Sequence, residues 1–118
     1  MKILGTGIDI IETKRIKKVI ASNKTFLKRV FTVREIDYCE GKANKFQHYA
    51  VRFAAKEAIL KALGSKGIAL IDISIKNLDN GKPEAVLSGK LKNLGKNIVV
   101  SLSHCNDYAV AQAIYYSR

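Results

Sequence analysis

The stretch RFAAKEAILKALG, residues 52–64, constrains the fold most, because it predicts a helix that is apolar almost all round. Alanine, leucine and lysine favour helices, and Gly64 is typical of the residue that follows a helix end. The pattern extends this helix back to about residue 47. Its only polar strip carries Arg52 and Lys56, so the helix must be largely buried and the fold built around it.

The rest of the chain predicts short helices and antiparallel strands. Thr13 and Thr32 are expected helix N-caps, Thr32 in a capping box with Glu35, and residues 89–97 are expected to form a basic loop. We expect strands at 2–11, 69–77, 84–88, 97–103 and 108–116, and helices at 13–21, 26–30 and 33–40. This order predicts an α+β fold, an antiparallel sheet with helices packed on one face, in a single domain over 1–118.

The composition is strongly basic, with 21 Lys and Arg against 10 Asp and Glu. A basic protein attracts nucleic acid, membrane surfaces, phosphorylated ligands or acidic proteins, although many small proteins are simply basic. No apolar run approaches the ~20 residues that span a bilayer, and Asp9 and Glu12 interrupt any signal-peptide pattern. Cys39 and Cys105 lack metal-site or disulfide spacing. We therefore expect a cytoplasmic protein.

Glu57 is the unusual residue of the buried helix. It projects to the same side as Phe53, Lys61 and Gly64, and a simple pair with Lys61 four residues on would explain it. Asp9 is equally unusual in a strand. Its neighbours on the same face, at positions 5 and 7, are glycines, which leave open space beside its carboxylate. A turn or a helix cap at the strand end is the alternative interpretation of Asp9.

Two carboxylates can form an acid/base pair or bind a hard cation such as Mg²⁺ together with phosphate oxygens. The basic residues Arg52, Lys56 and Lys61 near Glu57 favour the second use, because lysine beside a metal stabilises phosphate charge. The residues alone thus indicate Mg²⁺-dependent phosphoryl or phosphodiester chemistry. Asp9 and Glu57 are the candidate ligands.

His104 ends a predicted strand, where a structural role is as natural as a functional one. Ser101, Ser103 and His104 lack the order and context of a nucleophile elbow, so a serine hydrolase is not expected.

Three segments carry a family resemblance: GTGIDIIETKRI at 5–16, RFAAKEAILKALG at 52–64 and VVSLSHCNDYAVAQA at 99–113. TVREIDYC at 32–39 and DNGKP at 79–83 fit between them. Together they resemble the bacterial holo-[acyl-carrier-protein] synthase type of 4′-phosphopantetheinyl transferase over nearly the whole chain. The resemblance implies that fold, and transfer of 4′-phosphopantetheine from coenzyme A to a serine of apo acyl carrier protein, in support of fatty acid biosynthesis. Adenosine 3′,5′-bisphosphate would be the second product.

The resemblance also implies roles for single residues. Asp9 and Glu57 would bind Mg²⁺ with the coenzyme A diphosphate, and Lys61 would contact the diphosphate and stabilise the departing bisphosphate. Larger relatives carry a further acid where this chain has Ile11, so water would complete the coordination. The base that takes the serine proton is either water at the metal or Glu57. Candidates for the remaining coenzyme A contacts are Gly64 at the phosphates and Arg52 and His104 at the adenosine end.

Short members of this family are trimers, so the resemblance implies a homotrimer with sites between subunits and some ligand contacts from residues 34–45 of the neighbour. Acyl carrier proteins are acidic, and the helix after Asp9 offers them a basic face. That face carries Lys14, Arg15, Lys17 and Lys18. A nucleic-acid-binding module is disfavoured because no strand carries the aromatic motif of RNA-recognition domains. A two-carboxylate hydrolase would act without a carrier protein.

Overall fold

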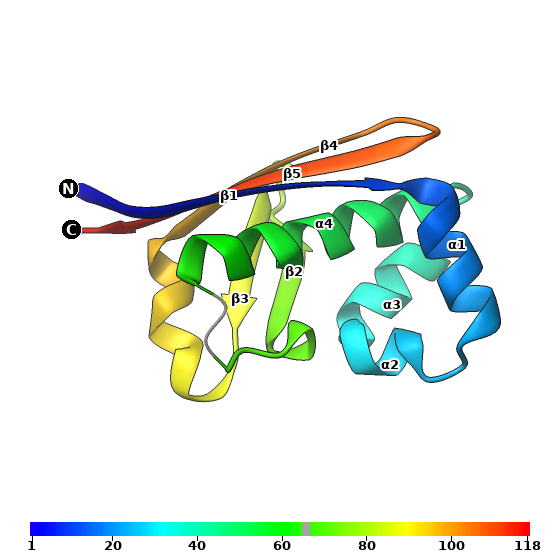
Figure 1. Cartoon of the computed structure of the whole chain (residues 1–118), viewed down its shortest axis with the longest axis horizontal. Helices are drawn as coiled ribbons and strands as arrows, with labels where there is room; N and C mark the ends of the chain where they lie inside the picture. The colour runs from blue at the N-terminus through cyan, green and yellow to red at the C-terminus, as the bar shows by residue number, and fades with distance from the viewer. Residues whose placement is uncertain (65–66) are drawn as a thin grey trace.

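The computed structural model describes residues 1–64 and 67–118. Its central element is helix α4 (Lys45–Leu63), which lies beneath a three-stranded sheet (Figure 1). Gly64 ends the helix in the left-handed region at φ 88°, a conformation that favours glycine. The helix expected from the sequence is confirmed, and it begins two residues earlier than expected. Its alanines, Ala54, Ala55 and Ala58, are fully buried.

The sheet above α4 is antiparallel, with the order β1-β5-β4. Its strands are β1 (Lys2–Glu12), β5 (Tyr108–Ser117) and β4 (Ile98–His104). The strand that comes last in the chain therefore lies in the middle and pairs with both of the others. Helix α4 covers one face of this sheet (Figure 1). The expected α+β fold, with helices on one face of an antiparallel sheet, is confirmed.

Strand β1 touches the backbone of α4 directly at two glycines. A Cβ atom at Gly5 would lie 2.0 Å from the carbonyl oxygen of Ala62, and one at Gly7 would lie 1.9 Å from that of Ala58. No side chain fits at either position, and the open space expected beside Asp9 from these glycines is wrong, because the backbone of α4 fills it. Because side chains alternate along a strand, Asp9 is the next residue after Gly7 on the face turned to α4.

A second sheet is the hairpin of β2 (Ile73–Asn77) and β3 (Pro83–Leu87), which supplies Ile73, Ile75 and Leu87 to the core around α4. Two expectations are wrong here. The strand expected over 69–77 begins only at Ile73, because residues 70–72 form a 3₁₀ turn, η1 (Leu70–Asp72), whose Asp72 carboxylate accepts from the N–H of Ala69. The loop expected over 89–97 is a 3₁₀ helix, η2 (Gly89–Asn97).

Three short helices lie at one end of α4 (Figure 1): α1 (Thr13–Ser22), α2 (Phe26–Val30) and α3 (Val33–Glu40). The capping box of Thr32 and Glu35 at the start of α3 is confirmed. The N-cap expected at Thr13 is wrong, because Glu12 takes that position without a side-chain bond. The N–H of Thr13 instead donates to the carbonyl of Asp107, which ties α1 to the turn before β5.

The outer face of the three-stranded sheet, turned away from α4, is exposed and largely apolar, with the polar side chains of Thr6, Gln112, Ser101 and Ser103 between the apolar ones. Ile8 and Ile10 of β1 are 62% and 65% exposed, and Val99 of β4 is 43% exposed. Among the described elements none lies over this face (Figure 1). Contiguous exposed apolar surface on a protein commonly marks an interaction site.

No helix in the described part of the chain has the length and apolar character needed to cross a bilayer.

Candidate active site

Asp9, Glu57 and Lys61 come together where β1 meets α4. The ammonium of Lys61 donates to the carbonyl oxygen of Ile8 at 2.8 Å and lies 3.4 Å from Oδ1 of Asp9. Asp9 is 19% exposed at its side chain and Lys61 is 53% exposed, so the cluster opens to solvent at the lysine. Lys61 thus forms its ion pair with Asp9 of β1. The alternative interpretation, in which Lys61 simply pairs with Glu57 within the helix, does not account for the direction of the Lys61 side chain.

The charge of Asp9 acts on the neighbouring carboxylate of Glu57. Burial raises the pKa of Glu57 above its usual range, the charge of Asp9 raises it further, and Lys61 offsets part of this. Like charges brought together in a partly desolvated site are costly unless a cation compensates them. Two carboxylates also form the oxygen donor set that Mg²⁺ prefers, with substrate and water oxygens completing the shell. The residues present therefore fit a divalent cation.

Within the described residues there is no cluster of three or more His, Cys, Asp or Glu side chains. Among the described residues, Asp9 and Glu57 are the carboxylates that could contribute to such a site here. Gly64 lies on the same side of α4, three residues beyond Lys61, and has open space where a side chain would be. An elongated ligand reaching from Asp9 along α4 would pass Lys61 before Gly64.

Arg52 lies elsewhere, on the side of α4 that faces α3. It is 2% exposed, and its guanidinium carbon stacks 4.2 Å from the ring centroid of Tyr38. Its Nε atom finds no hydrogen-bond partner among the described residues. Arg52 also lines a pocket of about 380 Å³ beside Arg34 and Lys76. Such a pocket can accept an anion, because three cationic side chains surround it.

A column of planar groups joins Arg52 to His104. The ring of Tyr38 lies 5.5 Å from that of His48, and His48 lies 5.1 Å from His104. Nδ1 of His104 is hydrogen bonded to the side chain of Gln47 at 2.8 Å. Burial, helped by the charges of His104 and nearby basic residues, lowers the pKa of His48 to about 4. The column is therefore neutral at His48, and its rings meet edge to face, at interplanar angles of 70° and 64°.

Sequence reasoning missed Tyr38 and His48. His48 could have been found, because it precedes Arg52 by four residues and so shares its face of the helix. Tyr38 could not, because no periodicity connects it to α4.

Within one chain the two groups of residues lie apart. Positions 52 and 57 are separated by roughly 140° around a helix, and the contacts agree: Lys61 reaches β1, whereas Arg52 packs on α3. The structure therefore brings Asp9, Glu57 and Lys61 together but does not bring Arg52 and His104 to them.

Lys56 does not contribute to either group, contrary to the expectation that it lies near bound phosphates. It is fully buried, and its ammonium donates to Oε1 of Glu35 at 2.6 Å and to the carbonyl of Val30. Glu35 also accepts from the N–H groups of Thr32 at 2.9 Å and Ile75 at 2.8 Å. This buried network joins α4 to α3 and β2, and sequence reasoning saw only its capping box.

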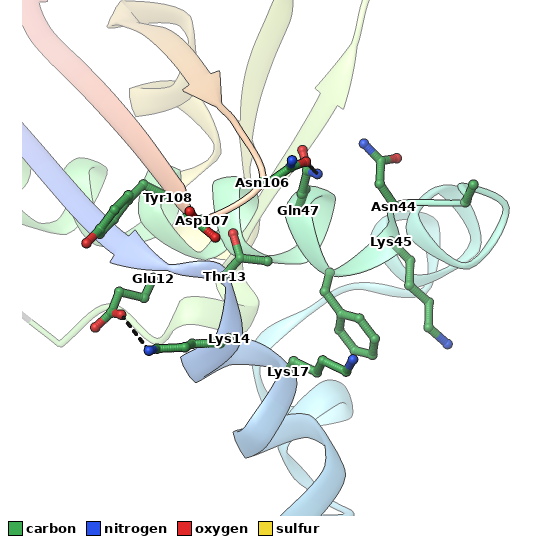
Figure 2. A pocket seen from close by; sticks show the side chains of 12 residues that line it. Glu12, Thr13, Lys14, Lys17, Asn44, Lys45, Gln47, Asn106, Asp107 and Tyr108 are labelled. Carbon is green, nitrogen blue, oxygen red and sulfur yellow. Dashed lines mark hydrogen bonds and ion pairs between the residues drawn. The ribbon is translucent and has the colours of Figure 1, made fainter.

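The basic side chains of α1 are exposed, as expected, and lie beside a cleft. Lys14 is 3.6 Å from Glu12, and Lys17 lies over the ring of Phe46 at 5.5 Å. Figure 2 shows Lys14 and Lys17 at one side of this cleft of about 520 Å³, which the start of α4 and the turn before β5 complete. The basic residues of this face are Lys14, Arg15, Lys17 and Lys18.

Comparisons with known proteins show the family to which this chain belongs. Residues 5–113 match the family model of the 4′-phosphopantetheinyl transferase superfamily. A holo-[acyl-carrier-protein] synthase of Ruminiclostridium cellulolyticum is 51% identical over 92% of this chain and 88% of its own. The holo-(acyl-carrier-protein) synthase of Bacillus anthracis, in complex with CoA (3′,5′-ADP), superposes with a TM-score of 0.83 at 35% identity over all of both chains. That of Helicobacter pylori, in complex with coenzyme A, gives 0.81 at 31% identity over 94% of this chain and 99% of its own. The chain therefore belongs to the holo-[acyl-carrier-protein] synthases of the 4′-phosphopantetheinyl transferase superfamily.

Proposed function

We propose that this enzyme transfers the 4′-phosphopantetheine group of coenzyme A to a serine of apo acyl carrier protein, releasing adenosine 3′,5′-bisphosphate, and so supports fatty acid biosynthesis. The observation that carries the proposal is the pair of carboxylates, Asp9 and Glu57, held beside Lys61 where β1 meets α4. Its relatives bear the name of this activity, and two of them were solved with coenzyme A or its nucleotide part.

We assign Asp9 and Glu57 as the residues that would hold Mg²⁺. When bound, the ion would neutralise charge on the diphosphate oxygens of coenzyme A. The raised pKa of Glu57 supports this assignment, because it reflects a half-buried carboxylate next to another acid with only partial compensation from Lys61.

Lys61 would stabilise the departing bisphosphate. An ammonium carries three donors. Two of them are directed to β1, at the carbonyl of Ile8 and the carboxylate of Asp9. These bonds fix the direction of the side chain and leave one donor for a phosphate oxygen. We propose that a water molecule is the base that accepts the proton of the attacking serine, because the carboxylate of Glu57 would be bound to the cation.

We propose that the active enzyme is a homotrimer whose sites lie between subunits. The separation of Arg52 and His104 from the carboxylates supports this arrangement, since the column from Arg52 to His104 would bind the adenosine end and its 3′-phosphate from a neighbouring copy. The uncovered apolar face with Ile8 and Ile10 supports it too, because burying such a face stabilises association. Light scattering of active protein should give three times the mass of one chain, and an active monomer would contradict this assembly.

We propose that the basic face of α1 docks the carrier protein. Lys14, Arg15, Lys17 and Lys18 follow Asp9 closely along the chain and point to solvent. Opposite charges at the rim of an interface guide encounter and raise association rates. The serine of a carrier protein bound there would arrive near the end of β1 that carries Asp9.

The decisive experiment is the intact mass of an apo acyl carrier protein after incubation with the enzyme, coenzyme A and Mg²⁺. A gain of one phosphopantetheine is expected, and it should be lost with excess chelator. Asp9→Asn and Glu57→Gln should abolish it without unfolding the protein. No mass gain with the unmutated enzyme would refute the proposed reaction, and gain that persists with chelator would refute the metal.

A further inference from the structure

We propose that Gly5 and Gly7 are positioning residues that set the distance between the two carboxylates and thereby the size of cation that the site prefers. The inference rests on the proposed function, because it takes Asp9 and Glu57 to be the metal-binding pair.

The glycines are required by contact and not by backbone conformation. Neither is among the glycines at positive φ, which are Gly64, Gly67, Gly81 and Gly89. Both lie within β1, in extended backbone that any residue adopts. What excludes a side chain is α4, whose carbonyl oxygens at Ala62 and Ala58 would lie 2.0 and 1.9 Å from the two added Cβ atoms.

These contacts are next to the carboxylates on both elements. Gly7 is two residues before Asp9 on the same face of β1, and its contact partner Ala58 directly follows Glu57 in α4. The bond from Lys61 to the carbonyl of Ile8 at 2.8 Å is a second link at the same place. This close backbone approach of β1 to α4 thus determines where the side chains of Asp9 and Glu57 begin.

A Cβ at Gly7 would force the two backbones apart. Bringing its contact with Ala58 from 1.9 Å only to 3.0 Å requires a retreat of about 1 Å, because the obstacle is backbone and not a flexible side chain. Mg²⁺ demands near-ideal geometry at about 2.0–2.1 Å, whereas Ca²⁺ accepts flexible shells at about 2.3–2.6 Å. A wider gap should therefore penalise Mg²⁺ much more than Ca²⁺.

The experiment measures binding of coenzyme A by calorimetry, without carrier protein, in Mg²⁺ and separately in Ca²⁺. We expect Gly7→Ala to weaken Mg²⁺-dependent binding tenfold or more and Ca²⁺-dependent binding clearly less, so that the preference shifts to the larger ion. Gly5→Ala, farther from Asp9, should shift the preference in the same direction but less. Gly95→Ala is the matched control, since its Cβ would lie 3.2 Å from the carbonyl of Ala85 in another part of the chain.

The outcomes distinguish a failure of the positioning role of Gly5 and Gly7 from a failure of the metal site itself. If unmutated enzyme binds coenzyme A equally with and without metal, or Asp9→Asn changes nothing, the metal site itself is wrong. If unmutated binding depends on metal but Gly7→Ala keeps the same Mg²⁺ to Ca²⁺ ratio, or Gly95→Ala shifts it as much, the positioning role is wrong. If both β1 variants fail to fold, the glycines are requirements for folding, and the positioning role is again overturned.

Discussion

Replacing Lys56 by methionine should destabilise the fold severely, although a methionine has nearly the same shape. The ammonium and the Glu35 carboxylate are 2.6 Å apart and both side chains are 0% exposed. Removing one partner of a buried pair leaves the other charge uncompensated, which costs about 3–5 kcal/mol. Unfolding entropy of about 2.1 cal/mol/K per residue, over a chain of this length, is about 0.25 kcal/mol/K. The expected fall in unfolding temperature is thus roughly 12–20 °C.

The assay is thermal unfolding followed by circular dichroism at one fixed protein concentration, because the proposed subunit association would make the midpoint depend on concentration. Lys45→Met is the matched control. It removes an ammonium from the same helix, but from a pair with Glu40 at 3.3 Å whose side chains are 39% and 46% exposed. Exposed pairs contribute about 1 kcal/mol or less, so this midpoint should fall by only a few degrees.

A second variant tests the cause. Adding Glu35→Gln to Lys56→Met removes the stranded charge, so the double variant should recover part of the loss. A Lys56→Met protein that melts within a few degrees of the unmutated enzyme would refute the reasoning. So would a double variant less stable than the single one, because the stranded carboxylate would then not be the source of the penalty.

Three further substitutions test the basic face of α1, the apolar face of the sheet and the half-buried ring of His48. Arg15→Glu should reduce catalytic efficiency with carrier protein roughly tenfold or more and leave the Michaelis constant for coenzyme A unchanged, because an interfacial charge pair contributes about 1–5 kcal/mol. Steady-state kinetics with each substrate varied in turn would measure both constants. A change in the coenzyme A constant alone would mean that α1 lies at the nucleotide. Ile10→Lys should lower the mass measured by light scattering, because it puts a charge on the apolar face. An unchanged mass would mean that Ile10 does not lie in the proposed interface. The pKa of His48 is about 4 in the folded chain and about 6.5 when unfolded, so the native state binds fewer protons between these values. Stability should therefore fall as pH drops from about 6.5 towards 4, and melting curves of His48→Gln should show a shallower fall over that range.

The sequence predicts most of this fold where the signal is local. Helix α4 follows from its composition, its end from Gly64, and the start of α3 from the capping box of Thr32 and Glu35. Each signal lies within a few residues of the feature that it predicts. Thr13 shows the limit, because threonine can begin a helix either as the cap or as the first helical residue, and here a contact with distant Asp107 decides.

The candidate site, like the fold, could be predicted from the sequence only where the signal is local. Asp9 and Glu57 are anomalous in their own segments, an acid in a strand and an acid in an apolar helix, so the sequence alone draws attention to them. The environment of Lys56 is invisible at that level, because its partner Glu35 is 21 residues away. Arg52 and Lys56 therefore look like a solvated strip although both are buried.

The order β1-β5-β4 has a consequence for how the enzyme is made. β5 lies between the other two strands and comes last in the chain, so a ribosome must finish almost the whole described sequence before the sheet can form. Until then the strand with Asp9 has no strand to pair with, because its partner residues lie more than 90 positions away, such as Ala111 opposite Asp9. Pairings that distant are slow and leave strand edges open to aggregation. We therefore expect nascent chains released before Tyr108 to need chaperones, and shortening β5 to damage the site through β1 although β5 contributes none of the proposed ligands.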